Sequence, residues 1–179
     1  DIDASQQALE FYSHDASLFE MIPQLVVFPK NTNDLQQLVI CAHLLKKEIP
    51  NLSLTARSAG TCMSGGAIND SVIVDFTQHM NLIENVQELS ARAQPGVFYR
   101  DFEKATLAKN ALMPTFPASR DLAAIGGMVA NHAGGEKSLQ YGKIDNFVQK
   151  LSVVLSEGQV YELRALNSQE LGAKRALQN

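Results

Sequence analysis

The chain has 179 residues, of which 45% are hydrophobic and 19% are charged, and its formal net charge at pH 7 is −4. This composition is ordinary for a globular domain, and the acidic balance offers no basic surface for nucleic acid. No apolar stretch approaches the roughly 20 residues that a membrane-spanning helix needs.

The two cysteines and the N-terminal residues bear on the compartment. Cys41 and Cys62 form no CxxC motif, and the chain is too long to depend on one disulfide. The opening residues "DIDAS" lack the basic start and the apolar core of a signal peptide. We therefore expect a cytoplasmic protein, with peripheral attachment at the inner membrane as the alternative.

The first predicted elements are a strand, a helix and two more strands. Residues 25–28 are an apolar run ended by proline, which is typical of a buried strand. A helix begins after Asn31, and its apolar residues recur on one face up to Leu45. Strands are predicted at 52–56 and 72–76. A strand, a helix and a strand joined at this spacing predict a parallel pair in a βαβ unit.

A second block of elements begins near residue 82. Its pattern predicts an α+β class with two lobes, a small parallel βαβ lobe at about 21–80 and a larger, mostly antiparallel lobe flanked by helices at about 81–179. The elements predicted in this block are a strand at 89–94, an amphipathic helix at 98–109, a helix at 122–133 capped by Asp121, an antiparallel hairpin at 148–163 and a helix at 167–179.

Two segments rich in small residues are candidates for a binding site. The first is "RSAGTCMSGGA" at 57–67, where successive small residues let backbone N–H groups converge on an anion. It lacks the GK[ST] of a Walker loop, and a strand follows it instead of a helix. A phosphate-binding loop and a plain flexible loop both remain open on this spacing.

The second segment is "PASRDLAAIGGMVANHAGGEKSLQYG" at 117–142, which contains two Gly-Gly pairs. Gly126 and Gly127 fall early in a predicted helix, where each glycine costs about 1 kcal/mol relative to alanine. Such a cost indicates close approach by another backbone or by a ligand, and tight helix packing is the simpler alternative.

Together the two segments resemble the FAD-binding domain of the vanillyl-alcohol oxidase and p-cresol methylhydroxylase superfamily (PCMH-type). "PQLVVFPKNTNDLQQLV" is similar to its P-x-x-V-V-x-P and capped helix, and the 57–67 loop is similar to its R-G-G-G-T-x-x-x-G loop. "MPTFPASRDLAAIGGMVANHAGGEKSLQYG" resembles its P-x-x-P-x-S, I-G-G, A-G-G and Y-G motifs. Within the superfamily the likeness is to D-lactate, glycolate and D-2-hydroxyglutarate dehydrogenases.

The resemblance implies FAD as the cofactor and assigns it to matching positions. The pyrophosphate would be wrapped mostly by backbone amides, the flavin would lie along the second segment, and the adenine would meet Val153 or Val154. The implied cofactor-binding residues are Arg57, Ser58, Ala59, Gly60, Thr61, Ser64, Gly65, Pro117, Ser119, Ile125, Gly126, Gly127, Asn131, Gly134, Tyr141, Gly142 and Val153.

The chain departs from the family pattern at several positions. Ser58 and Ala59 replace the usual Gly-Gly, which would be strained if either residue needed a positive φ. Thr61 stands where tethering relatives have a histidine, so we expect noncovalent FAD. His132 could hydrogen-bond near the flavin or be structural, and Cys62 could be an activated thiol or only a small residue that fits. No metal-ligand spacing is found.

The implied function is the FAD-binding domain of a flavin-dependent 2-hydroxy-acid dehydrogenase or oxidase, with hydride transfer to flavin N5. Its substrate would be of the D-lactate, glycolate or D-2-hydroxyglutarate type, and its electron acceptor is unknown. The resemblance places the catalytic groups in a substrate domain beyond residue 179, so no catalytic residue is assigned and this chain alone is expected to be inactive. The alternatives are an FAD-dependent alcohol or sugar oxidase and a flavin-binding module without chemistry.

Overall fold

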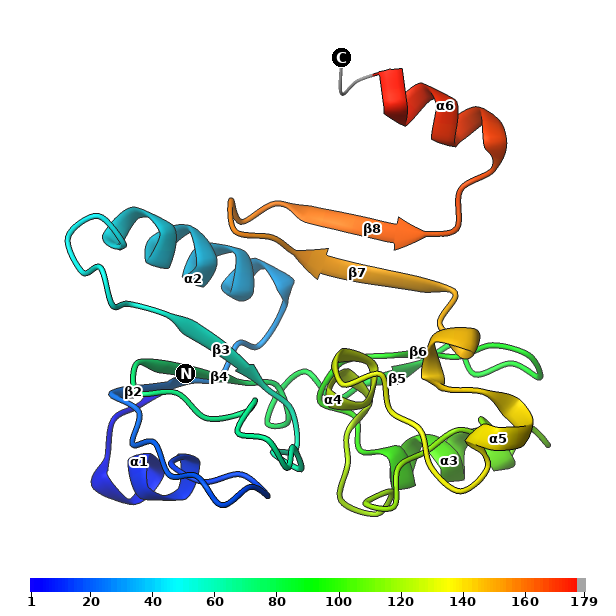
Figure 1. Cartoon of the computed structure of the whole chain (residues 1–179), viewed down its shortest axis with the longest axis horizontal. Helices are drawn as coiled ribbons and strands as arrows, with labels where there is room; N and C mark the ends of the chain where they lie inside the picture. The colour runs from blue at the N-terminus through cyan, green and yellow to red at the C-terminus, as the bar shows by residue number, and fades with distance from the viewer. Residues whose placement is uncertain (177–179) are drawn as a thin grey trace.

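A four-stranded sheet forms one lobe of the computed structural model, which describes residues 1–176 (Figure 1). Its strands are β1 (Ile2–Asp3), β2 (Leu25–Val27), β3 (Leu54–Arg57) and β4 (Val72–Asp75), in the order β1-β2-β4-β3. β2 and β3 run parallel, as predicted, but β4 lies between them and pairs with both. All four residues of β4 are buried, which suits the central position.

Helices cover both faces of this sheet. Asn31 caps α2 (Thr32–Leu45) by accepting a hydrogen bond from the Asp34 amide at 3.0 Å, as predicted. α2 packs Leu35 and Leu38 against the core of one sheet face. On the other face lies α1 (Gln6–Tyr12), which the sequence reading did not predict, as it did not predict β1.

The second lobe is built around a separate apolar core. Helix α3 (Tyr99–Leu107) confirms the amphipathic prediction, whereas the strand expected at 89–94 shrinks to β6 (Arg92–Ala93) paired with β5 (Ile83–Glu84). The core residues are Val97, Tyr99, Phe102, Phe116, Ala123, Met128 and Ile144. The remaining short elements are α4 (Ile125–Ala130), α5 (Ser138–Tyr141) and the 3-10 helix η1 (Ile144–Phe147).

The predicted helix at 122–133 begins later than expected, and Asp121 does not cap it. Ala124 occupies the N-cap position in an extended conformation and forms a β-bridge with Phe98. The Ile125 amide then donates to the Val97 carbonyl at 2.8 Å. Because this pairing holds residue 124 extended, the helix cannot start before Ile125.

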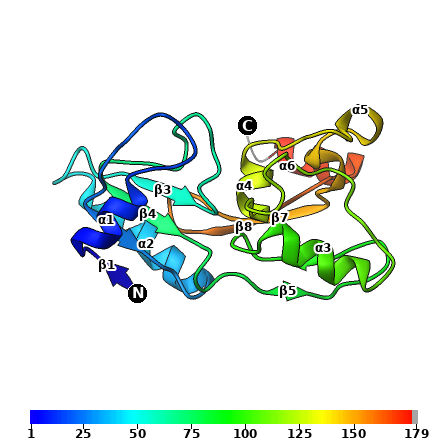
Figure 2. The same cartoon turned by 90° about the horizontal axis from the view of Figure 1, so that it is seen from below.

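An antiparallel hairpin reaches from the second lobe back to the first. β7 (Lys150–Val154) and β8 (Val160–Arg164) pair as predicted. At the turn, the Gln36 side chain of α2 donates to the Gly158 carbonyl at 2.8 Å. The two lobes therefore lie side by side with the hairpin spanning both (Figure 2). The mixed four-stranded sheet, in which β1 is antiparallel to β2, the antiparallel pairs and the helices confirm the α+β class.

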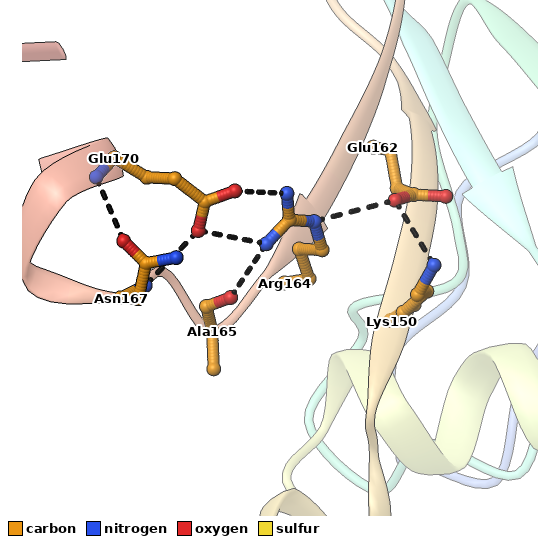
Figure 3. A network of polar contacts seen from close by, with 6 residues as sticks. All are labelled: Lys150, Glu162, Arg164, Ala165, Asn167 and Glu170. Carbon is orange, nitrogen blue, oxygen red and sulfur yellow. Dashed lines mark hydrogen bonds and ion pairs between the residues drawn. The ribbon is translucent and has the colours of Figure 1, made fainter. Parts of the chain in front are cut away.

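The last helix, α6 (Ser168–Ala176), is attached to β8 by polar contacts (Figure 3). Asn167 and Glu170 exchange side-chain-to-amide hydrogen bonds of 2.9 and 3.0 Å, which is a capping box. Arg164 of β8 bonds the Glu170 carboxylate at 2.6 Å. Residues 177–179 of the predicted helix lie outside the described residues. Among residues 1–176, no helix is both long and apolar enough to span a bilayer.

Candidate functional site

A hollow lined by small residues lies where the loop after β3 meets helix α4. Its volume is about 80 Å³, well below the range of about 300–1,000 Å³ for complete ligand pockets, so it can enclose only part of a large ligand. Six of the predicted site residues line it, namely Ser58, Ala59, Gly60, Thr61, Gly127 and Asn131. Six others were missed by sequence reasoning, namely Ala56, Cys62, Gly66, Ala67, Ala124 and Ala130.

The missed residues share one signal, which is small size within or beside the two segments already singled out. The other predicted residues do not line the hollow, and their roles remain predictions. They are Arg57, Ser64, Gly65, Pro117, Ser119, Ile125, Gly126, Gly134, Tyr141, Gly142 and Val153. Most of them lie along the second lobe or, for Val153, in the hairpin.

The loop residues that line the hollow have free backbone amides. The amides of residues 58 to 61 have no hydrogen-bond acceptor within the described part of the chain. The Gly127 amide also has no acceptor among the described residues, whereas the amides of Ile125 and Gly126 donate to Val97 and Pro95. Successive residues with free N–H groups that line one concavity suit an anion such as phosphate.

The loop conformation depends on glycine at one position and tolerates Ser58 and Ala59. Gly60 has φ +67°, and a Cβ there would lie 2.5 Å from the Arg57 guanidinium. The only non-glycine residues with positive φ in the described chain are Asn85, Asn110 and His132. Replacing the family's Gly-Gly by Ser58-Ala59 therefore introduces no left-handed strain.

Ser58 also joins the loop to the second lobe. Its hydroxyl donates to the Pro95 carbonyl at 2.8 Å, and the Gly126 amide donates to the same oxygen at 2.9 Å. A Cβ on Gly126 would meet that oxygen at 2.7 Å. Gly126 is thus explained by the close approach of another backbone, that of Pro95, and not by tight helix packing, whereas Gly127 lines the hollow.

Arg57 lies beneath the loop and does not point into the hollow. The residue is 7% exposed, and its Nη1 donates to the carbonyls of His14 at 2.7 Å and Ala67 at 3.2 Å. Burial lowers the pKa of this guanidinium, and the charge of Asp75 acts against that shift. Arg57 does not line the hollow, so its side chain has a different role from the implied pyrophosphate contact.

Cys62 and His132 have different surroundings. Cys62 lines the hollow, and hydrogen bonding from Ser64, whose Oγ lies 3.3 Å from the sulfur, lowers the pKa of the thiol. His132 is exposed, ends α4 with φ +49°, and lies 3.5 Å from Asp145. The described residues contain no group of three or more His, Cys, Asp or Glu side chains that could hold a metal ion.

The fold and the hollow define a class of protein, a two-lobed α+β domain that offers free amides to an anionic ligand between its lobes. A family model described as "FAD binding domain" matches residues 23–164. The chain therefore belongs to the FAD-binding domain family, and FAD is its cofactor.

Similar proteins agree with this assignment and confirm the resemblance. The chain is 34% identical over 156 residues to a D-2-hydroxyglutarate dehydrogenase of Haemophilus influenzae, covering 86% of this chain and 15% of that protein. It is 33% identical over 162 residues to the glycolate oxidase subunit GlcD of Bacillus subtilis, covering 88% and 33%. The chain thus spans at most a third of either relative.

A solved structure shows the same fold. An alkyldihydroxyacetonephosphate synthase matches with a TM-score of 0.77 at 23% identity, over 95% of this chain and 33% of that one. At this identity the match concerns the fold alone.

Proposed function

We propose that this chain is the FAD-binding domain of an oxidoreductase that oxidises a 2-hydroxy acid of the D-lactate, glycolate or D-2-hydroxyglutarate type. The observation that carries the proposal is the hollow of small residues with free amides at residues 58–61 and 127. The names of the relatives supply the substrate class.

The residues present fit a noncovalently bound FAD. The hollow would accept a phosphate, because five residues with free amides line it and no acidic side chain does. The pyrophosphate would lie against Ser58–Thr61 with Ser64 and Gly65, and Ser119 would approach it from the other lobe. Amide dipoles, not cations, would offset its charge.

The remaining implied contacts follow the second lobe toward the flavin and the hairpin toward the adenine. Gly127 and Asn131 of the α4 region line the hollow beside the loop. Val153 lies in β7, close to where the hairpin contacts α2. An extended dinucleotide between the lobes would thus meet elements from both.

When bound, FAD supplies an acceptor for hydride from the substrate α-carbon at its N5 atom. The residues of this chain would bind and orient the cofactor through backbone donors. A base for the substrate hydroxyl and cations for its carboxylate would come from another part of the protein. We therefore assign no catalytic residue here.

The test is anaerobic mixing of the FAD-loaded full-length protein with D-lactate, glycolate, D-2-hydroxyglutarate, a primary alcohol or a sugar, followed by flavin absorbance. Bleaching by a 2-hydroxy acid and not by the alcohol or sugar is expected. Bleaching by the alcohol or sugar instead would overturn the substrate class, and no bleaching by any compound would favour a module without chemistry. The 179-residue chain alone, loaded with FAD, should not bleach.

A further inference from the structure

The segment before residue 23, where the family match begins, contacts the loop that forms the hollow. The carbonyls of Tyr12 and His14 accept hydrogen bonds from Arg57 Nη1 at 3.4 and 2.7 Å. The Ala16 amide donates to the Gly60 carbonyl at 3.2 Å. The Tyr12 ring also lies 5.1 Å from the guanidinium. Two independent connections therefore join this segment to the loop.

Arg57 connects three parts of the chain at once. Besides the carbonyls of Tyr12 and His14, its Nη1 donates to the carbonyl of Ala67. Because Arg57 begins the loop and Ala67 ends it, this hydrogen bond joins the two ends of the loop. Gly60 lies against the guanidinium so closely that a Cβ there would be 2.5 Å from it. The conformation of the loop backbone thus depends on the position of the Arg57 side chain.

The charge of Arg57 also offsets two carboxylates beneath the loop. Asp75 is the register partner of Arg57 across β3 and β4, is 3% exposed, and its charge raises the pKa of the guanidinium against the lowering effect of burial. Asp15 has one buried oxygen without a hydrogen-bond partner. Without the guanidinium, two negative charges would lie under a loop that must bind an anion.

We propose that Arg57 is a positioning residue for the cofactor and that segment 12–16 is part of the FAD site, although neither the Arg57 side chain nor the segment lines the hollow. Arg57 holds the loop in the conformation that points its amides at the ligand. This inference rests on the proposed placement of FAD at the loop. If loss of the Arg57 hydrogen bonds leaves only about a tenth of the molecules with the loop in its binding conformation, the apparent affinity for FAD falls about tenfold.

The test uses FAD titration of the apo chain, followed by flavin fluorescence, at a temperature where circular dichroism shows every variant folded. Arg57→Met should weaken FAD binding about tenfold or more. Arg57→Lys keeps the charge but not the forked geometry, so it should recover only part of the affinity. Ala16→Pro removes the donor to Gly60 without changing charge and should also weaken binding. Arg100→Met is the matched control, because Arg100 also lies over a ring (Phe98, 4.3 Å) and donates to a carbonyl, that of Asp121.

Hydrogen exchange separates positioning from general destabilisation. Arg57→Met should speed exchange of the Ala16 amide, which donates to the Gly60 carbonyl of the loop, while leaving the amides of β7 and β8 unchanged. The inference would be overturned by equally faster exchange in the hairpin or by full recovery of FAD affinity in Arg57→Lys. Native FAD affinity in both Arg57→Met and Ala16→Pro would overturn it as well. If Gly127→Asp also retained native affinity, the proposed placement of FAD would fail as well; if Gly127→Asp alone lost binding, only this inference would fail.

Discussion

The Ser58 hydroxyl donates to the Pro95 carbonyl at 2.8 Å, and this hydrogen bond joins the loop of the first lobe to the second lobe beside the hollow. The residue that replaces a family glycine thus has a structural use of its own. The Pro95 carbonyl accepts a second hydrogen bond from the Gly126 amide, so one carbonyl bonds both the loop and helix α4.

Ser58→Ala should lower the free energy of unfolding by about 1 kcal/mol, because it removes one partly buried hydrogen bond. In a chain of this size, the melting temperature should fall by about 2–4 °C. Thermal unfolding of the apo chain measures the effect. Ser156→Ala is the control, since that hydroxyl contacts only neighbouring Glu157 at 3.3 Å. Equal melting temperatures for the two variants would contradict the interlobe role.

His132→Gly should stabilise the chain by about 1 kcal/mol, because His132 has φ +49° at the end of α4. The His132 and Ala133 amides donate to Val129 and Met128 in the pattern that usually ends with glycine. The lost contact with Asp145 is exposed and contributes little. Thermal melts should show an increase for His132→Gly and a decrease for His132→Val. A lower melting temperature for His132→Gly would show that the Asp145 contact outweighs the strain.

Glu170 should titrate far below an ordinary glutamate. Hydrogen bonding from Arg164 lowers its pKa from 4.5 to about 2, with the Asn167 amide as the next cause. Because the folded pKa is the lower one, the contact stabilises the start of α6 above about pH 4.5 and is lost as the pH falls toward 2. Carboxyl-carbon NMR should report this pKa, and Arg164→Met should raise it. An unshifted pKa in the parent chain would mean that the contact of Figure 3 is not formed in solution.

FAD should be released when the loaded protein is precipitated with acid, because Thr61 replaces the tethering histidine and no histidine lines the hollow within the described chain. A yellow supernatant with a colourless pellet is expected. Flavin retained in the pellet would contradict noncovalent binding.

Helices, caps and turns could be predicted from the sequence where residues close together in the chain determine them. The Asn31 cap, the apolar face of α2 and the hairpin turn each depend on neighbouring residues. The position of β4 between β2 and β3 was not predictable from periodicity, because alternation gives a strand but not its neighbours. Asp121 looked like a cap, yet pairing of Ala124 with Phe98 determines where α4 begins.

The small residues that line the site could be predicted from the sequence, but the orientation of the Arg57 side chain could not. The loop and α4 were found because glycine and alanine cluster there, and the missed lining residues have the same character. The inward turn of Arg57 depends on carbonyls at Tyr12 and His14, more than 40 residues away, which no local pattern indicates.

The most direct test of the central claim is FAD titration of Gly127→Asp beside Gly172→Asp. Gly127 lines the hollow, whereas nothing lies within 4 Å of a Cβ added at Gly172, so the two variants add the same group in different places. A charge about 4 Å from the diphosphate costs about 4 kcal/mol at an effective dielectric of about 20, or about a thousandfold in Kd. We expect Gly127→Asp to lose FAD binding while remaining folded by circular dichroism, and Gly172→Asp to bind as the parent does. Native affinity in Gly127→Asp would show that FAD binds elsewhere on the chain.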